Sequence, residues 1–433
     1  MTFQYTMFSV RRALLLATAC VTVTACSLDL ENPNAPTENQ VVTSPDGVLS
    51  VTVGMQAQFA QTIDDYTVTN SLVTDEWGTQ GIALISYISL FTGDNFDASY
   101  DVVRAPFANS YQVIRSANTA IAGTDQVELG DANTAGVRAT AYLFKAMALG
   151  FLTQQYESVP VDVTELGGTP APRDVVLDTV LVLLERARTE LEPFADADLA
   201  AFRSRVLADG FDLRNTIDAM LARYYLMDGQ YASAIAAADR VDLSVLSVLE
   251  YLPPTRNPIE NLAFQLRYVA GLQSFVDEAE AGDQRPGFWL DVAASPLTAN
   301  PPDSVLKPLL QYSAPTDPFP LYLPDEMKLI KAEAYTRLGQ FNLAEPLVNE
   351  VRTQTSSLVD EPLAGLAALP ATDLDSEAEL LAQIAYERRY ELYMQGLRWE
   401  DTRRFGTALT TDPTFDYLPL PQQECQTNPQ AQC

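Results

Sequence analysis

Histidine is absent from all 433 residues of this chain, and its absence excludes several classes of enzyme and metal site. Ser-His-Asp and Cys-His nucleophile systems need an imidazole base, so this sequence can build neither of them. Zinc and non-haem iron sites with imidazole ligands are excluded for the same reason. Carboxylate chemistry remains available, as paired acids for glycoside hydrolysis or as oxygen ligands for calcium.

Basic residues are scarce. The chain has 27 lysines and arginines against 57 aspartates and glutamates, which gives a formal net charge of -30. Nucleic acids and anionic lipid surfaces reward basic patches, so we predict no nucleic-acid partner. Hydrophobic residues make up 47% of the chain, which is enough to bury a large core.

Cofactor motifs are missing as well. The sequence contains no glycine-rich phosphate loop, no Cys-x-x-Cys pair and no EF-hand spacing. We therefore predict no cofactor and no metal site. Beyond the amino terminus, no segment is long and apolar enough to cross a bilayer.

The amino terminus carries a charged and then apolar stretch. Arg11 and Arg12 precede the apolar run 13–19, which is typical of a signal peptide over residues 1–25. Small residues lead into Cys26, as in the lipobox of bacterial lipoproteins, so Cys26 is the predicted lipidation site. Cys20 is a competing candidate with a poorer upstream context. Residues 26–44 are polar and contain proline, which predicts a lipidated flexible tether before a single domain over 45–433.

Two further cysteines lie near the carboxyl terminus, Cys425 and Cys433. In an oxidising compartment, a pair so close in sequence favours a small disulfide loop. Two free surface thiols are the alternative.

Helical patterns dominate the body of the chain. Residues 139–152 are rich in alanine and leucine on nearly every face, which predicts a buried helix. Gly229, Tyr231 and Ala234 recur as Gly339, Phe341 and Ala344, with the same offsets of two and five residues. This repeat predicts the tight turn and close approach of a tetratricopeptide-like helical pair. Residues 60–105 and 250–322 lose the helical period and predict long irregular insertions.

Each insertion contains an aromatic residue beside carboxylates, a composition suited to the apolar face and hydroxyl groups of a sugar. The predicted ligand-binding residues are Asp75, Trp77, Phe288, Trp289 and Asp291, with Tyr87, Tyr100 and Tyr312 as less complete additions. Glu76 stands beside Trp77 in the same run. The alternative for each aromatic residue is a core plug between helical pairs.

The stretch Ile384–Gly406 combines arginines, glutamates and aromatic residues at helical spacing. It resembles the C-terminal signature of the SusD/RagB family of outer-membrane nutrient-binding lipoproteins. Gln395, Leu397 and Thr402 depart from the usual pattern. The positions that we predict to be structural are Glu387, Arg388, Arg398, Trp399 and Asp401.

The resemblance implies a mainly α, SusD-like fold of tetratricopeptide-like helical pairs with long irregular ligand-binding insertions, most specific over about 250–433. It also implies a non-enzymatic lipoprotein, anchored to the outer membrane and facing the exterior. Such a protein binds an oligosaccharide or another nutrient, such as a peptide, and acts as the lid of a TonB-dependent transporter. The alternatives are a carboxylate-based glycoside hydrolase and a tetratricopeptide-type scaffold that binds proteins.

Overall fold

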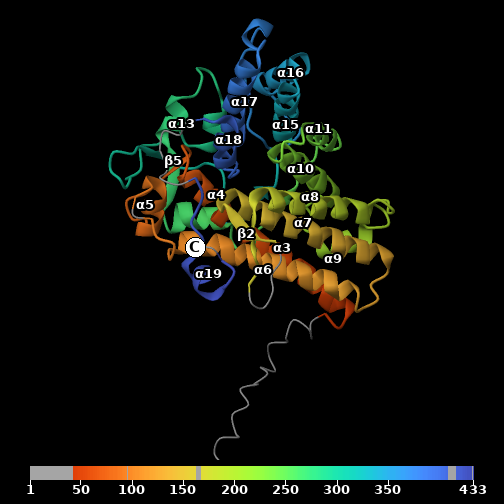
Figure 1. Cartoon of the computed structure of the whole chain (residues 1–433). Helices are drawn as coiled ribbons and strands as arrows, with labels where there is room; N and C mark the ends of the chain where they lie inside the picture. Colours follow the sequence, from red (N-terminus) through yellow and green to blue (C-terminus); the bar gives the residue numbers. More distant parts are fainter. Residues whose placement is uncertain (1–41, 95, 162–166, 408–415, 432) are drawn as a thin grey trace, which may run out of the picture. The chain divides into compact units, whose positions relative to one another are not determined.

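Helical pairs packed side by side form the frame of the computed structural model, which describes residues 42–94, 96–161, 167–407, 416–431 and 433 (Figure 1). Residues 42–433 form one contact unit. The predicted signal peptide, the lipidation site Cys26 and most of the predicted tether lie outside the described residues. No helix in the described ranges has the length and apolar character needed to span a membrane.

The helices come in the order α3 (Pro45–Ala60), α4 (Ile63–Leu72), α5 (Ile85–Thr92), α6 (Asp101–Thr124), α7 (Asp131–Gln155), α8 (Arg173–Leu191), α9 (Ala200–Val206), α10 (Leu213–Met227), α11 (Tyr231–Ala238), α12 (Pro258–Glu260), α13 (Gln273–Asp277), α14 (Arg285–Trp289), α15 (Pro324–Arg337), α16 (Phe341–Arg352), α17 (Glu377–Glu391), α18 (Arg398–Phe405) and α19 (Gln422–Thr427). Two short irregular helices are η1 (Asn261–Gln265) and η2 (Ala371–Asp373). The strands are β1 (Trp77–Thr79), β2 (Ser158–Pro160), β3 (Pro170–Pro172), β4 (Val248–Leu249), β5 (Val269–Leu272), β6 (Leu306–Lys307) and β7 (Phe319–Pro320).

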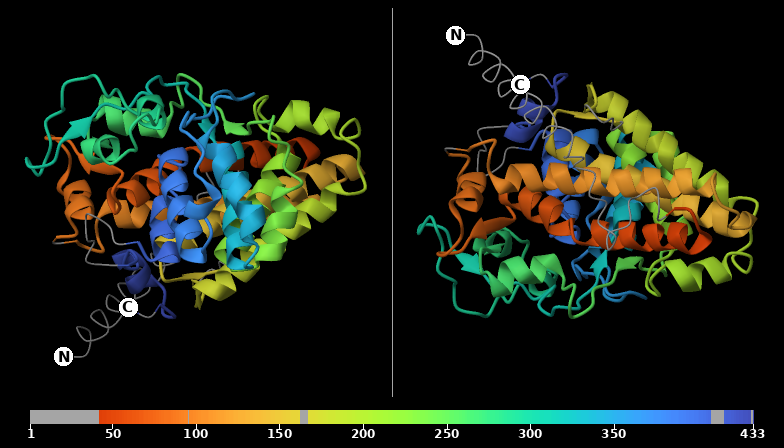
Figure 2. Two further views of the ribbon diagram at one scale, coloured as in Figure 1. Left: turned by 90° about the horizontal axis from the view of Figure 1, so that it is seen from above. Right: turned by 90° about the horizontal axis from the view of Figure 1, so that it is seen from below.

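Successive helices contact one another along the chain. Helix α6 packs on α7, α7 on α8, α8 on α10, α11 on α15, and α15 on both α16 and α17. Figure 2 shows α3 and α6 running alongside each other. The mainly α class of fold predicted from the sequence is therefore confirmed.

The repeat predicted from the sequence forms the turns of two such pairs. Gly229 separates α10 from α11, and Gly339 separates α15 from α16. Both glycines have a positive φ, 74° and 71°, which a residue with a Cβ adopts only at a cost. Ala234 and Ala344 are fully buried, as close helix approach requires.

The buried helix predicted over 139–152 is the central part of α7, where alanine and glycine let neighbouring helices approach closely. A Cβ built on Gly150 would lie 1.9 Å from the hydroxyl oxygen of Tyr224 on α10. Glycine is therefore required at this crossing of α7 and α10 because a larger side chain would clash with Tyr224. The backbone conformation does not require it.

The two insertions are more regular than predicted. The first contains α4, β1 and α5, and the second contributes β5 and β6 to an antiparallel sheet of order β1-β5-β6. In this sheet Trp77 pairs with Gly271 of β5, so the two insertions are joined by backbone hydrogen bonds. Strands of two to four residues leave too short a pattern to be recognised from sequence.

The signature stretch folds as α17, a turn and α18. The helical spacing of aromatic residues over this stretch predicts one longer helix, but α17 ends at Glu391 and Tyr393 lies in the turn that follows. Gly396 has a φ of 72° there, and its carbonyl oxygen accepts a hydrogen bond from Asn70 of α4 at 2.7 Å. The turn therefore contacts the first insertion directly.

Charged side chains of the signature are buried in ion pairs. Arg388 on α17 holds Asp401 on α18 with an Nε–Oδ2 distance of 2.8 Å. Arg398 on α18 holds Asp75 at the same distance, across 323 residues of sequence. Trp399 is buried beside them. These contacts join α17 to α18 and α18 to the first insertion.

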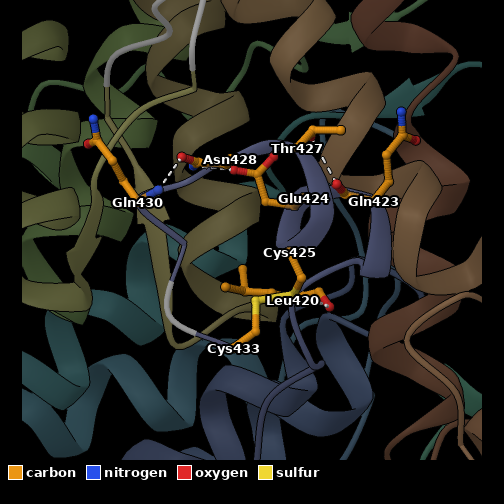
Figure 3. The surroundings of a disulfide bond; sticks show 8 residues. All are labelled: Leu420, Gln423, Glu424, Cys425, Thr427, Asn428, Gln430 and Cys433. Carbon is orange, nitrogen blue, oxygen red and sulfur yellow. Dashed lines mark hydrogen bonds between the residues drawn. A yellow bond between two sulfur atoms is a disulfide. The ribbon is translucent and has the colours of Figure 1, made fainter.

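Cys425 and Cys433 form a disulfide in the structure, with their Cα atoms 5.9 Å apart. The bond closes a short loop after α19, and Figure 3 shows the polar residues around it. Within this loop Asn428 donates a hydrogen bond to Glu424 at 2.6 Å and another to the carbonyl of Gly168 at 2.8 Å. The loop is thus attached to the segment that leads into α8.

Candidate functional site

A cavity of about 300 Å³ lies where the first insertion meets the second. Helices α4, α5 and α6 supply most of its wall, and the segment around η1 closes it. The side chains that give this cavity its chemistry are Gln61, Asp64, Asp65, Tyr87, Asp101, Asn109 and Tyr268. A volume of this size lies at the small end of the range for small-molecule sites.

Two tyrosines from different insertions meet in the cavity. The ring centroids of Tyr87 on α5 and Tyr268 before β5 are 5.5 Å apart, and the ring planes are tilted by 45°. Both side chains are half-buried. A tyrosine ring offers an apolar face, and its hydroxyl group can both donate and accept hydrogen bonds. The pair is therefore suited to a ligand that is apolar on one side and rich in hydroxyl groups on the other.

Adjacent carboxylates on α4 give the cavity its charge. Burial raises the pKa of Asp65 to about 6, although the hydrogen bond from Asn109 at 2.7 Å opposes this shift. Burial, and then the neighbouring charge of Asp65, raises the pKa of Asp64 well above its usual range. A carboxyl group with such a pKa can donate a proton to a ligand as well as accept one.

The rim of the cavity is apolar. Leu84, at the start of α5, and Leu266, after η1, line the cavity and are both exposed. Ile82 and Ile85 flank Leu84 and are 58% and 63% exposed. A polar floor with an apolar rim is a common composition for a small-molecule site.

The two tryptophans predicted to bind ligand, Trp77 and Trp289, do not line this cavity. Trp77 is fully buried in β1, and Trp289 is 2% exposed and donates its indole N–H to the carbonyl of Tyr390 at 2.9 Å. The prediction that these two rings bind ligand is wrong for this structure, because their faces are covered by the core. The alternative weighed from the sequence, a core plug, describes both of them.

The carboxylates beside those tryptophans differ in role. Asp75 is buried, and although burial favours its neutral form, Arg398 and then Arg389 hold its pKa below the usual range. It is therefore a structural partner and not a ligand contact, which corrects the prediction. Phe288 and Asp291 are half-buried and packed near Trp289, away from the lining of the tyrosine cavity.

Of the less complete candidates, only Tyr87 lines the cavity. Tyr312 is buried and accepts a hydrogen bond from Gln395, and Tyr100 packs against Phe96. Tyr268, Asp64 and Asp65 were missed. Tyr268 has no carboxylate beside it in the sequence to mark it as a sugar contact. The two aspartates belong to a segment that the sequence pattern predicts to be irregular and that forms α4.

Glu76, next to Asp75, is a buried acid whose charge state we expect to influence stability. Burial raises its pKa from 4.5 to about 8, against the hydrogen bond that Ser71 donates at 2.7 Å. Because the folded pKa lies above the unfolded one, its contribution is complete below pH 4.5 and is lost as the pH rises through 8. Between pH 5 and pH 9, we expect the wild type to lose on the order of a few kcal/mol relative to Glu76→Gln.

Urea unfolding of the wild type and Glu76→Gln at each pH measures this difference. The contributions of the other titratable groups are the same in both proteins and therefore cancel in the difference. Glu157→Gln, at an exposed position, serves as the control and should follow the wild type at both pH values. A constant difference between Glu76→Gln and the wild type across this range would show that Glu76 does not change its charge there.

A second cavity, of about 240 Å³, lies between α6 and α19. Its lining is mostly apolar, and the hydroxyl group of its one tyrosine, Tyr111, already donates to the carbonyl of Pro160 at 2.5 Å. It offers fewer free polar groups to a sugar than the tyrosine cavity does.

Comparison with known proteins agrees with the signature stretch. Residues 318–417 match the model of the SusD family. A SusD-like protein of Formosa agariphila is 36% identical over 85 residues, and the match spans 19% of this chain and 16% of the length of that relative.

Solved structures share the fold over most of the chain. A SusD-like carbohydrate-binding protein from Bacteroides vulgatus has a TM-score of 0.66 at 16% identity, with 83% of each chain covered. A laminarin-binding SusD-like protein has a TM-score of 0.65 at 16% identity and covers 87% of this chain and 97% of its own. The match over the signature and the shared fold agree: residues 318–417 are similar to the SusD family, and the chain has the fold of the SusD-like structures.

Proposed function

We propose that this protein binds an oligosaccharide in the tyrosine cavity and is a non-enzymatic nutrient-binding lipoprotein. The observation that carries the proposal is the meeting of Tyr87 and Tyr268 over the carboxylates of α4. Sugars present an apolar face of C–H groups and an edge of hydroxyl groups, and this cavity offers a partner to each. Relatives with this fold that bear the names carbohydrate-binding and laminarin-binding support the same class of ligand.

The sequence of the amino terminus and the similarity to the SusD family support the cellular setting that we propose. We infer that residues 1–25 are removed, that Cys26 is acylated, and that residues 26–44 tether the domain to the outer membrane, facing the exterior. Several acyl chains on one cysteine supply the stable anchoring that a single chain does not. The bound nutrient would then be delivered to a TonB-dependent transporter, with this protein as its lid.

Calorimetry with a panel of neutral glycans tests the ligand class. We expect saturable binding of at least one oligosaccharide and no binding of peptides of similar length. If peptides bind and no glycan does, the proposed ligand class would change from oligosaccharide to peptide. Purification from its own membranes in mild detergent tests the partner, and we expect a barrel transporter to co-purify. If repeated purifications contain no transporter, the proposal that this protein is the lid of a transporter would be contradicted.

One observation favours the hydrolase alternative enough to test it. Asp65, with a pKa of about 6, could protonate a leaving group, as the acid of a glycoside hydrolase does. Hydrolysis also needs a second carboxylate on the other side of the scissile bond, whereas Asp64 and Asp65 are adjacent on one helix. The third carboxylate of the lining, Asp101 on α6, is paired with Arg104. Reducing-end assays on the glycans that bind should therefore detect no product. Release of reducing ends would favour the enzyme.

A further inference from the structure

Three carboxylates meet between the signature helix and the last helical pair. Asp325 lies in the first turn of α15, Glu361 in the loop after α16, and Glu391 at the end of α17. One oxygen of each side chain lies within 4.8 Å of those of the other two. Asp325 and Glu391 are fully buried, and Glu361 is 5% exposed. We call these residues the acidic triad.

Glu391 has no hydrogen-bond donor at either of its carboxylate oxygens among the described residues. Its contact with a cation there is Arg285 Nη1 at 3.7 Å, which is longer than a charge-assisted hydrogen bond. Native proteins rarely leave a buried carboxylate in this state, because its lost hydration must be replaced by a partner. The unpartnered side chain of Glu391 therefore points to a group that the protein atoms do not supply.

The other two members of the triad are oriented by their neighbours. Glu361 Oε1 accepts hydrogen bonds from Gln354 at 2.9 Å and from Ser357, while its Oε2 has no donor. Lys328 pairs with Asp325 at 2.7 Å. Residues that orient a ligating carboxylate in this way are typical of metal sites in proteins.

The charges around the triad do not balance. Five buried carboxylates share this network, and they are Asp283, Asp325, Glu361, Glu387 and Glu391. The cations paired with them are Arg285, Lys328 and Arg352. Arg352 and Lys328 are also shared with the more exposed Glu280 and Glu350. At least two negative charges are therefore left over among the buried groups, and a divalent cation would neutralise two of them.

We propose that Asp325, Glu361 and Glu391 bind a divalent cation of the calcium class, which joins α15, the loop after α16 and α17. Calcium takes six to eight oxygen ligands at about 2.4 Å, so two ligands on opposite sides of it lie about 4.8 Å apart. Three carboxylates can supply up to six oxygens, and no histidine is needed. This cation site is independent of the proposed sugar site and of the proposed transporter.

Protons are the competing way to neutralise the triad. Burial, and then the charge of Asp325, raises the pKa of Glu391 well above its usual range, and burial also raises the pKa values of Asp325 and Glu361. Bound protons and a bound cation both remove the excess charge. They differ in whether metal is present in the purified protein and whether added metal changes its stability.

The test is metal analysis and thermal unfolding of the full chain, treated with EDTA and then titrated with CaCl₂ or MgCl₂. We expect one calcium per chain and a rise of roughly 3–6 °C in Tm at saturating calcium. Absence of both effects would overturn the proposal and leave the triad protonated. Binding of Mg²⁺ without Ca²⁺ would overturn the assignment to calcium.

Two variants make the assignment specific. Glu361→Gln keeps the shape of the side chain and removes one charged ligand, so we expect it to weaken calcium binding at least tenfold. Glu260→Gln changes a buried glutamate outside the triad, one oxygen of which has no hydrogen-bond donor among the described residues but lies 3.3 Å from Arg256 Nε, and it should bind calcium like the wild type. Equal calcium affinity in the two variants would show that Glu361 is not a ligand and that calcium binds at a site other than the acidic triad. If Glu361→Gln does not fold, the calcium titration of the wild type still decides the proposal.

Discussion

Replacing Arg285 with methionine is expected to lower the free energy of unfolding by about 3–5 kcal/mol, a large part of the total stability of a protein domain. Arg285 is fully buried. It donates to Asp283 at 2.7 Å, lies 2.6 Å from Glu387, and is in range of Glu391. Methionine fills a similar space but leaves these carboxylates without their cation, and a buried charge that has lost its partner is costly.

Urea unfolding followed by circular dichroism measures the effect, and Arg205→Met is the matched control. Arg205 pairs with Asp46 at 2.8 Å, a distance close to those of the buried pairs, but its side chain is 56% exposed. Exposed ion pairs contribute about 0–1 kcal/mol, so this control should remain close to the wild type. Equal midpoints for the two variants would mean that the carboxylates around Arg285 are neutralised by other means.

Replacing Tyr268 with alanine is expected to weaken glycan binding at least tenfold, which corresponds to about 1.4 kcal/mol. Tyr268 and Tyr87 pack against each other in the lining of the cavity, and truncation of an aromatic anchor in a small site removes most of its apolar contact area. Tyr87→Ala should have an effect of the same order, and the double variant should show no measurable binding.

Calorimetry with the best glycan of the panel measures these affinities, with Tyr231→Ala as the control. Tyr231 is a half-buried tyrosine at the start of α11, outside the lining of the cavity, so its loss should leave the affinity unchanged. Thermal unfolding of each variant shows whether it is folded. Folded Tyr268→Ala and Tyr87→Ala proteins with wild-type affinity would remove the sugar site from this cavity.

The frame of the molecule could be predicted from the sequence because its signals are local. The repeat of Gly229 and Tyr231 at Gly339 and Phe341 marks two tight turns, and tight turns have residue requirements that can be read directly. The signature stretch adds charged residues whose pairing partners, such as Arg388 and Asp401, lie only 13 residues apart.

The site could not be predicted in the same way, because the composition around Trp77 and Trp289 is shared by ligand platforms and by core plugs. Burial decides between the two, and burial depends on β1 and β5, which pair across about 190 residues of sequence. Tyr87 and Tyr268 are brought together by the same sheet. A pattern of residues cannot show which strands of two to four residues will pair over such a distance.

The ion pair between Asp75 and Arg398, together with the hydrogen bond from Asn70 to Gly396, also has a consequence for the order of assembly. These contacts span 323 and 326 residues, so the first insertion has no partner for its buried aspartate until nearly the whole chain has been made. Closing loops of this length is slow, because their entropy must be lost before the contact is gained. During synthesis, these contacts of the first insertion would therefore form only after α18 has been made. In a chain truncated before α18, Asp75 would lack its ion pair with Arg398. We therefore expect truncated chains to be less stable around the first insertion than the full chain.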